Sequence, residues 1–218
     1  MQTLKKHQSS LEVELPIEYY VQTPASPPKE AILLLHGYGQ GAEKFLNLFE
    51  PGFLEGSLLI AANGPFMVPE KRGDTYRMGH SWYFYDSASD EYIISMKPAV
   101  EMWTKIVHEL SIQSMPKRII GYSQGGYLAS FVAKGLTHVS QVLGISSQFL
   151  DGELEFPLPF RMDAVHGDQD EICSYQKAKH SHEKLVKTGV IGEFVTITKG
   201  AHRMSVEALH EVKRLIKL

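Results

Sequence analysis

The chain of 218 residues is long enough for one well-buried core and too short for two domains of ordinary size, so we expect a single domain over residues 1–218. With 43% hydrophobic and 22% charged residues and a net charge of −3, it has a globular composition that gives no electrostatic reason to expect nucleic acid or an anionic membrane as partner. A single cysteine excludes an internal disulfide, and no apolar run approaches the roughly 18 residues of a membrane span, so we expect a cytoplasmic protein without stable membrane insertion.

The expected strands are short and strongly patterned. Apolar and polar residues alternate from Leu11 to Leu15, which predicts a half-exposed strand that Ile17 to Val21 continue as the arm of a hairpin. A wholly apolar run, typical of a strand buried on both faces, follows at 31–35, and mainly apolar runs of similar form lie at 57–62, 117–122, 139–145 and, more weakly, 161–165.

Helical periodicity appears between and after these runs. Apolar residues share one face in segments at 99–110, 127–132, 177–187 and 206–216. This alternation predicts the α/β class, with a mostly parallel central sheet and helices on both faces. Residues 63–91 fit neither pattern. The segment is too long for a simple connecting loop, so we expect it to shape a pocket.

A G-x-S-x-G motif centred on Ser123 lies between a buried-strand pattern and a helical pattern. A sharp strand-to-helix turn of this kind lifts a serine hydroxyl above the sheet edge, and the flanking glycines avoid collisions with neighbouring backbone. We therefore predict an α/β-hydrolase fold with Ser123 as nucleophile.

A serine nucleophile needs a base and an orienting acid, which in this fold follow it in the order serine, acid, histidine. His202, after the alternating strand at 194–198 and before the last helix, is the expected base. Asp168 and Asp170 both follow the strand at 161–165, and spacing alone does not choose between them.

Two backbone amides are expected to form the oxyanion hole, those of Gln124, directly after the nucleophile, and of Tyr38, after the first buried strand. His36 precedes the serine and is expected to fix its own loop by hydrogen bonds. Trp82 and Tyr83 are expected to line the substrate pocket, with core packing as the alternative, and Cys173 to act as a small buried hydrophobe.

No motif for metal or nucleotide binding is present, because G-Y-G-Q-G at 37–41 lacks the P-loop lysine and the full dinucleotide fingerprint. We therefore expect no cofactor and no metal.

The segments LLLHGYGQ, ANGP, IIGYSQGGYLAS, HGDQDEI and KGAH together resemble the phospholipase/carboxylesterase family, which includes acyl-protein thioesterases. The resemblance runs from about residue 32 to 202. It implies an α/β-hydrolase fold with no large cap domain and a triad of Ser123, Asp170 and His202, with Asp170 chosen by the HGxxD pattern. It also implies cofactor-free hydrolysis of a small-molecule ester or acyl-thioester through an acyl-enzyme.

Two departures from the family pattern concern substrate choice: Ile172-Cys173 replaces the usual Val-Pro, and residues 70–80 are charged. Lysophospholipase, peptidase or perhydrolase activity remains open, as does a hydrolase-fold binding protein without turnover. The sequence is compatible with a homodimer but does not determine the oligomeric state.

Overall fold

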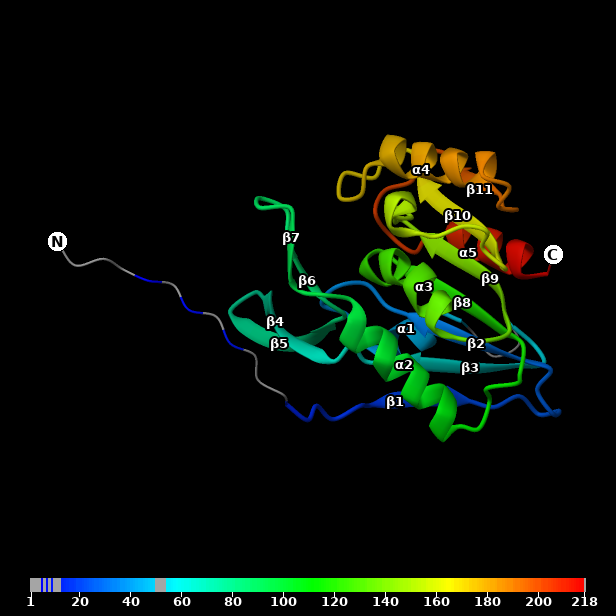
Figure 1. Ribbon diagram of the computed structural model, residues 1–218, viewed down its shortest axis with the longest axis horizontal. Coiled ribbons are helices and arrows are strands. Elements are labelled where there is room, and N and C mark those ends of the chain that lie inside the picture. The colour runs from blue at the N-terminus through cyan, green and yellow to red at the C-terminus, as the bar shows by residue number, and fades with distance from the viewer. Residues whose placement is uncertain (1–4, 6, 8, 10–12, 50–53, 218) are drawn as a thin grey trace.

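The computed structural model describes residues 5, 7, 9, 13–49 and 54–217. Its centre is a seven-stranded sheet in which all neighbours are parallel, except that the first strand runs antiparallel to its neighbour (Figure 1). In spatial order the strands are β1 (Tyr19–Gln22), β3 (Ser57–Ala62), β2 (Glu30–Leu35), β8 (Lys117–Tyr122), β9 (Val139–Ile145), β10 (Arg161–Gly167) and β11 (Phe194–Ile197). The predicted mostly parallel sheet is confirmed.

Helices cover both faces of this sheet because its central strands are apolar on both sides. Along β2, Leu33 packs in the cluster with α2, α3 and α4, whereas Leu34 packs in the cluster with α1 and α5. Burying one such leucine contributes about 1.5–3 kcal/mol. The helices are α1 (Ala42–Leu46), α2 (Lys97–Glu109), α3 (Gln124–Gly135), α4 (Tyr175–Lys187) and α5 (Val206–Ile216), with a 3₁₀ turn at Asp151–Glu153.

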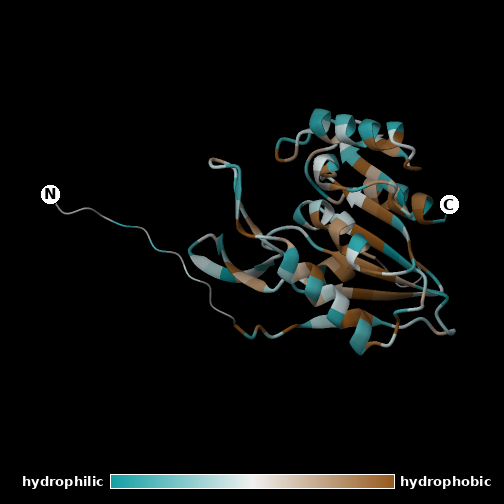
Figure 2. Ribbon diagram, in the orientation of Figure 1, coloured by the Kyte–Doolittle hydropathy of each residue, from teal (hydrophilic) through white to brown (hydrophobic). Residues whose placement is uncertain are grey.

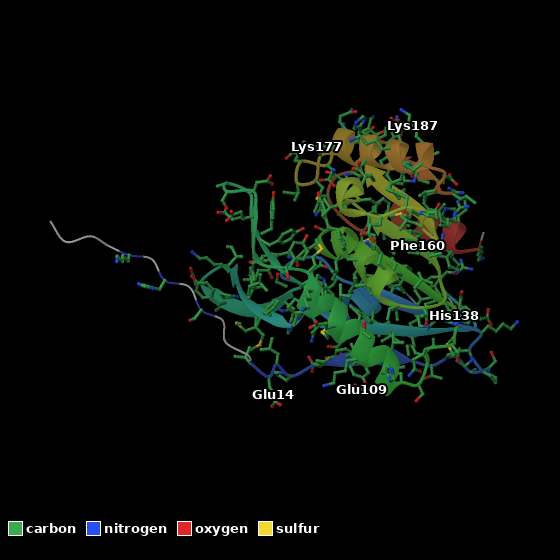
Figure 3. All side chains as sticks on the ribbon, in the orientation of Figure 1. Glu14, Glu109, His138, Phe160, Lys177 and Lys187 are labelled. Carbon is green, nitrogen blue, oxygen red and sulfur yellow. The ribbon has the colours of Figure 1, made fainter. Side chains whose placement is uncertain are left out.

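Hydropathy separates the inside of the molecule from its outside. The central strands are brown in Figure 2, and α4 shows much teal. Lys177 and Lys187 of α4 lie at the outer edge of the molecule in Figure 3. No helix within the described ranges is long and apolar enough to cross a membrane.

The N-terminal strand differs from the prediction. Leu11 and Glu12 lie outside the described residues, and residues 13–18 contain no strand. Pro16, which has no N–H to donate, interrupts the alternating run. The strand that does form, β1, pairs with β3 and not with the next strand in the chain, because both edges of β2 are occupied by β3 and β8.

Residues 63–91 fold mainly into two β-hairpins that project from the sheet (Figure 1). The first joins β4 (Phe66–Arg72) to β5 (Thr75–Ser81) through a tight turn in which Gly73 has φ +60°. The second joins β6 (Phe84–Asp86) to β7 (Glu91–Ile94). Neither pair has the continuous apolar run of a buried strand, so the sequence patterns did not reveal them.

Candidate active site

Ser123 occupies a sharp turn between β8 and α3. Its backbone has φ 51° and ψ −118°, a conformation that costs a residue with a side chain about 1–3 kcal/mol. Its amide donates to the Ile145 carbonyl at 2.8 Å, which fixes the turn to β9. A Cβ on Gly125 would lie 2.2 Å from the Leu35 carbonyl oxygen, so the turn requires glycine there.

The side chains of Ser123, His202 and Asp170 form a continuous hydrogen-bonded chain. Nε2 of His202 lies 3.0 Å from the Ser123 Oγ, and Nδ1 of His202 lies 2.8 Å and 3.0 Å from the two carboxylate oxygens of Asp170. Since a carboxylate only accepts, Nδ1 carries the proton and Nε2 is left free to accept from the serine hydroxyl. The three predicted residues thus come together from three separate loops.

The structure distinguishes the two aspartates that the sequence left open. The Asp170 side chain is fully buried, and its Oδ1 accepts from the amides of Ile172 at 2.9 Å and Cys173 at 2.8 Å. Asp168 is exposed to solvent. Contact with His202 is made by Asp170, the residue that the family resemblance favoured.

His202 is also held in place through its backbone carbonyl. The Tyr122 hydroxyl donates to the His202 carbonyl at 3.1 Å, and the two rings lie 5.3 Å apart. Burial raises the pKa of Tyr122 to about 12, so its hydroxyl keeps the proton that it donates. Sequence analysis missed this contact, because Tyr122 occupies a variable position of the G-x-S-x-G motif.

The loop that carries Tyr38 lies beside the serine, and Gln124 follows the serine directly in the chain. A Cβ on Gly37 would lie 3.4 Å from the Ser123 Cβ, so the Tyr38 loop borders the nucleophile. Gly37, Gly39 and Gln40 each use their amide within this part of the protein. Within the described ranges, no protein acceptor is recorded for the amides of Tyr38 and Gln124, which leaves both N–H groups available to a substrate oxygen.

Strand β5 backs the Tyr38 loop. The Gly39 amide donates to the His80 carbonyl, and the His80 amide donates to the Gln40 carbonyl, both at 2.9 Å. A Cβ on Gly79 would lie 2.1 Å from the Gly39 carbonyl oxygen, so the close approach of the two segments requires glycine. This function of the 63–91 segment could not be seen in the sequence.

Trp82 and Tyr83 lie in the core. The Trp82 ring is fully buried, stacks on Trp103 at 6.2 Å and donates through Nε1 to the His36 carbonyl at 2.7 Å. The Gln124 side chain fixes this segment, accepting from the Trp82 amide and donating to the Tyr83 carbonyl. Their contribution to a substrate pocket stays a prediction; the contacts observed here are those of core packing.

The expectation for His36 is confirmed. Its Nε2 accepts from the Gly64 amide at 3.0 Å, and its Nδ1 donates to the Gly37 carbonyl at 2.8 Å. Burial lowers the pKa of this imidazole to about 4, so it is neutral at neutral pH and holds the Tyr38 loop from beneath.

Cys173 is buried, as expected, but it lies nearer to the nucleophile than the sequence indicated. The side chains of Tyr127 and Ser123 interact with its thiol, whose pKa is raised mainly by burial. In the described part of the chain, no group of three or more His, Cys, Asp or Glu side chains could hold a metal ion.

Comparison with known proteins assigns the chain to a family. The phospholipase/carboxylesterase family model matches residues 18–218. The chain belongs to the phospholipase/carboxylesterase family. Membership identifies it as a hydrolase of the carboxylesterase and thioesterase class.

Individual known proteins are similar to this chain over nearly their full lengths. The chain is 26% identical to acyl-protein thioesterase 1 homolog 1 of Dictyostelium discoideum, covering 90% of this chain and 93% of that protein. Its fold matches esterase PE8 with a TM-score of 0.76 at 18% identity, covering 92% and 98% of the two chains. Zea mays acyl-protein thioesterase 2 matches with 0.71 at 18% identity, covering 92% and 97%. The predicted α/β-hydrolase fold is confirmed.

Proposed function

We propose that the protein hydrolyses carboxylic esters through an acyl-enzyme on Ser123, with His202 as general base and acid and Asp170 as its orienting carboxylate. The observation that carries the proposal is the 3.0 Å contact between the Ser123 Oγ and the unprotonated Nε2 of His202. Hydrogen-bond reach between nucleophile and base is the geometric requirement for this chemistry.

The proposed reaction has two halves. The Ser123 Oγ attacks the acyl carbonyl carbon while His202 Nε2 takes the hydroxyl proton, and the amides of Tyr38 and Gln124 bind the oxyanion. His202 then gives this proton to the leaving alkoxide as the carbon–oxygen bond breaks. A water molecule, deprotonated by His202, then attacks the acyl-serine; His202 returns that proton to the Ser123 Oγ as its bond to the acyl carbon breaks, which releases the carboxylic acid and regenerates Ser123.

An acyl thioester is the second candidate substrate, with a thiolate in place of the alkoxide. It is favoured by the relatives from Dictyostelium discoideum and Zea mays, which are named acyl-protein thioesterases. The thiolate is expelled from the corresponding tetrahedral intermediate, so the same residues serve both substrates.

The test is the pre-steady-state kinetics of a p-nitrophenyl ester. We expect a burst stoichiometric with enzyme, labelling of Ser123 by a fluorophosphonate, and loss of both in Ser123→Ala. Asp170→Asn should lower kcat by about 10⁴-fold, because the amide favours the wrong imidazole tautomer. The exposed Asp168→Asn, its matched control, should keep wild-type turnover.

Undiminished turnover in Ser123→Ala, or a larger loss in Asp168→Asn than in Asp170→Asn, would contradict the assignment. Running an oxygen ester and a thioester with the same acyl group in parallel compares the two candidates. A thioester kcat/KM below that of the oxygen ester would count against the second.

A further inference from the structure

A second imidazole contacts the Asp170 carboxylate. His166, near the end of β10, has a fully buried side chain, and its Nε2 lies 3.2 Å from the Asp170 Oδ2. The same nitrogen lies 3.0 Å from the Cys173 carbonyl oxygen. Asp170 therefore lies in contact with two imidazoles, only one of which reaches Ser123 through a hydrogen bond.

The neighbours of His166 determine where its proton lies. Both groups near Nε2 are oxygen acceptors, so Nε2 carries the proton; it donates to the Cys173 carbonyl and turns its positive N–H dipole toward the nearby Asp170 Oδ2. Nδ1 is buried and accepts no hydrogen bond from the part of the chain that the structure describes. The ring is fixed by stacking on Phe194 at 6.3 Å and by an edge contact with Tyr175 at 6.0 Å.

The His166 donor completes the support of the carboxylate. The amides of Ile172 and Cys173 hold Oδ1, whereas Oδ2 is bonded to His202 at 2.8 Å and lies 3.2 Å from His166. Without His166, the support of Oδ2 would come from the imidazole that Asp170 is meant to orient. The bond from His166 to the Cys173 carbonyl also fixes the loop whose amides hold Oδ1.

We propose that His166 is a positioning residue for the hydrolysis: by bonding the Cys173 carbonyl and lying against Oδ2 it keeps the Asp170 carboxylate in the orientation that aligns His202 with Ser123. The inference rests on the proposed function of these three residues. His166 acts through Asp170, so it should influence the rate of the chemical step and leave substrate binding unchanged.

The experiment separates the donor from the ring. His166→Phe keeps a stacking ring and removes the donor, whereas His166→Gln places an amide N–H close to the position of Nε2. With p-nitrophenyl acetate we expect His166→Phe to lower kcat by about 10- to 100-fold, the combined effect of losing the bond to the Cys173 carbonyl and the N–H dipole beside the carboxylate, with KM changed less than twofold. His166→Gln should recover most of this loss.

A double-mutant cycle tests whether the effect passes through Asp170. In an Asp170→Ala background, His166→Phe should cause no further loss of kcat, because residues that act as a unit are not additive. Equal losses in both backgrounds, or no recovery in His166→Gln, would overturn the proposal. If His166→Phe does not fold by circular dichroism, His166→Asn, whose shorter amide cannot reach the same acceptors, replaces it with the same expected outcomes.

Failure of the proposed function has a different signature. If Ser123→Ala and Asp170→Ala both keep wild-type kcat, the assigned triad is wrong and the premise of this inference falls with it. If those two variants are inactive and His166→Phe turns over like wild type, only the assignment of His166 is overturned.

Discussion

Cys173 combines three contacts around the triad: its amide donates to Asp170, its carbonyl accepts from His166, and its thiol interacts with the Ser123 side chain. Because burial raises the pKa of this thiol, the reactive thiolate is scarce at pH 8 in the folded protein. We expect iodoacetamide to alkylate folded protein at least about 10-fold more slowly than protein in urea.

Mass spectrometry of a time course measures this reactivity at one site, since the sequence contains one cysteine. Cys173→Ala serves as the blank. Equal rates with and without urea would show that the thiol is accessible and ionised in the folded protein.

At the residue scale, the sequence predicted most of the proposed site. Ser123 and His202 could be chosen because the fold dictates the order of the motifs, but spacing did not distinguish Asp168 from Asp170. That distinction depends on which side chain turns inward within one short loop, and the family resemblance supplied it. His166 is the histidine of the HGxxD pattern, but its contact with Asp170 was missed, because neither that pattern nor a place within a buried strand shows which way its side chain points.

At the element scale, prediction succeeded where burial imposed a strong pattern. The apolar runs at 57–62, 117–122 and 139–145 coincide with β3, β8 and β9. The hairpins β4–β5 and β6–β7 were not predicted, because a two-stranded exposed ribbon is stabilised by register and turn chemistry more than by an apolar face. Helix α1, with 5 residues, is too short to show a helical period.

The β4–β5 hairpin has a testable function as the support of the Tyr38 loop. Gly79→Ala would place a methyl group 2.1 Å from the Gly39 carbonyl oxygen and push the loop away from Ser123. We expect a loss of about 1–3 kcal/mol in the free energy of unfolding and a fall in kcat of about 10- to 100-fold, less than complete loss of an oxyanion donor. Urea titration and ester kinetics measure the two effects.

The control for this prediction lies on the same strand. Tyr76→Ala removes a side chain that is 71% exposed and should leave both stability and kcat near wild type. If Gly79→Ala keeps full activity while losing stability, the position of the Tyr38 loop does not depend on β5.

For the whole molecule, the parallel sheet explains how residues distant in sequence meet. Strands β2, β8, β10 and β11 all end at one edge of the sheet, so the loops that follow them bring Tyr38, Ser123, Asp170 and His202 together.

The same architecture buries several imidazole side chains. Burial is the main cause of a lowered pKa for His36, His166 and His182, so all three make stability depend on pH in the same direction.

Burial lowers the pKa of His36 from its ordinary 6.5 to about 4 in the folded protein. Between these values the unfolded chain binds a proton that the folded protein does not, so stability is fully present above pH 6.5 and falls as the pH drops toward 4. This difference corresponds to about 3 kcal/mol in the free energy of unfolding. Urea titrations from pH 7.5 to 4 should show a shallower decline in His36→Gln, whose side-chain oxygen can still accept from the Gly64 amide. His210→Gln, at a side chain 79% exposed, should keep the wild-type slope. If the free energy of unfolding of wild type and His36→Gln fell in parallel with pH, His36 would titrate alike in the folded and unfolded states.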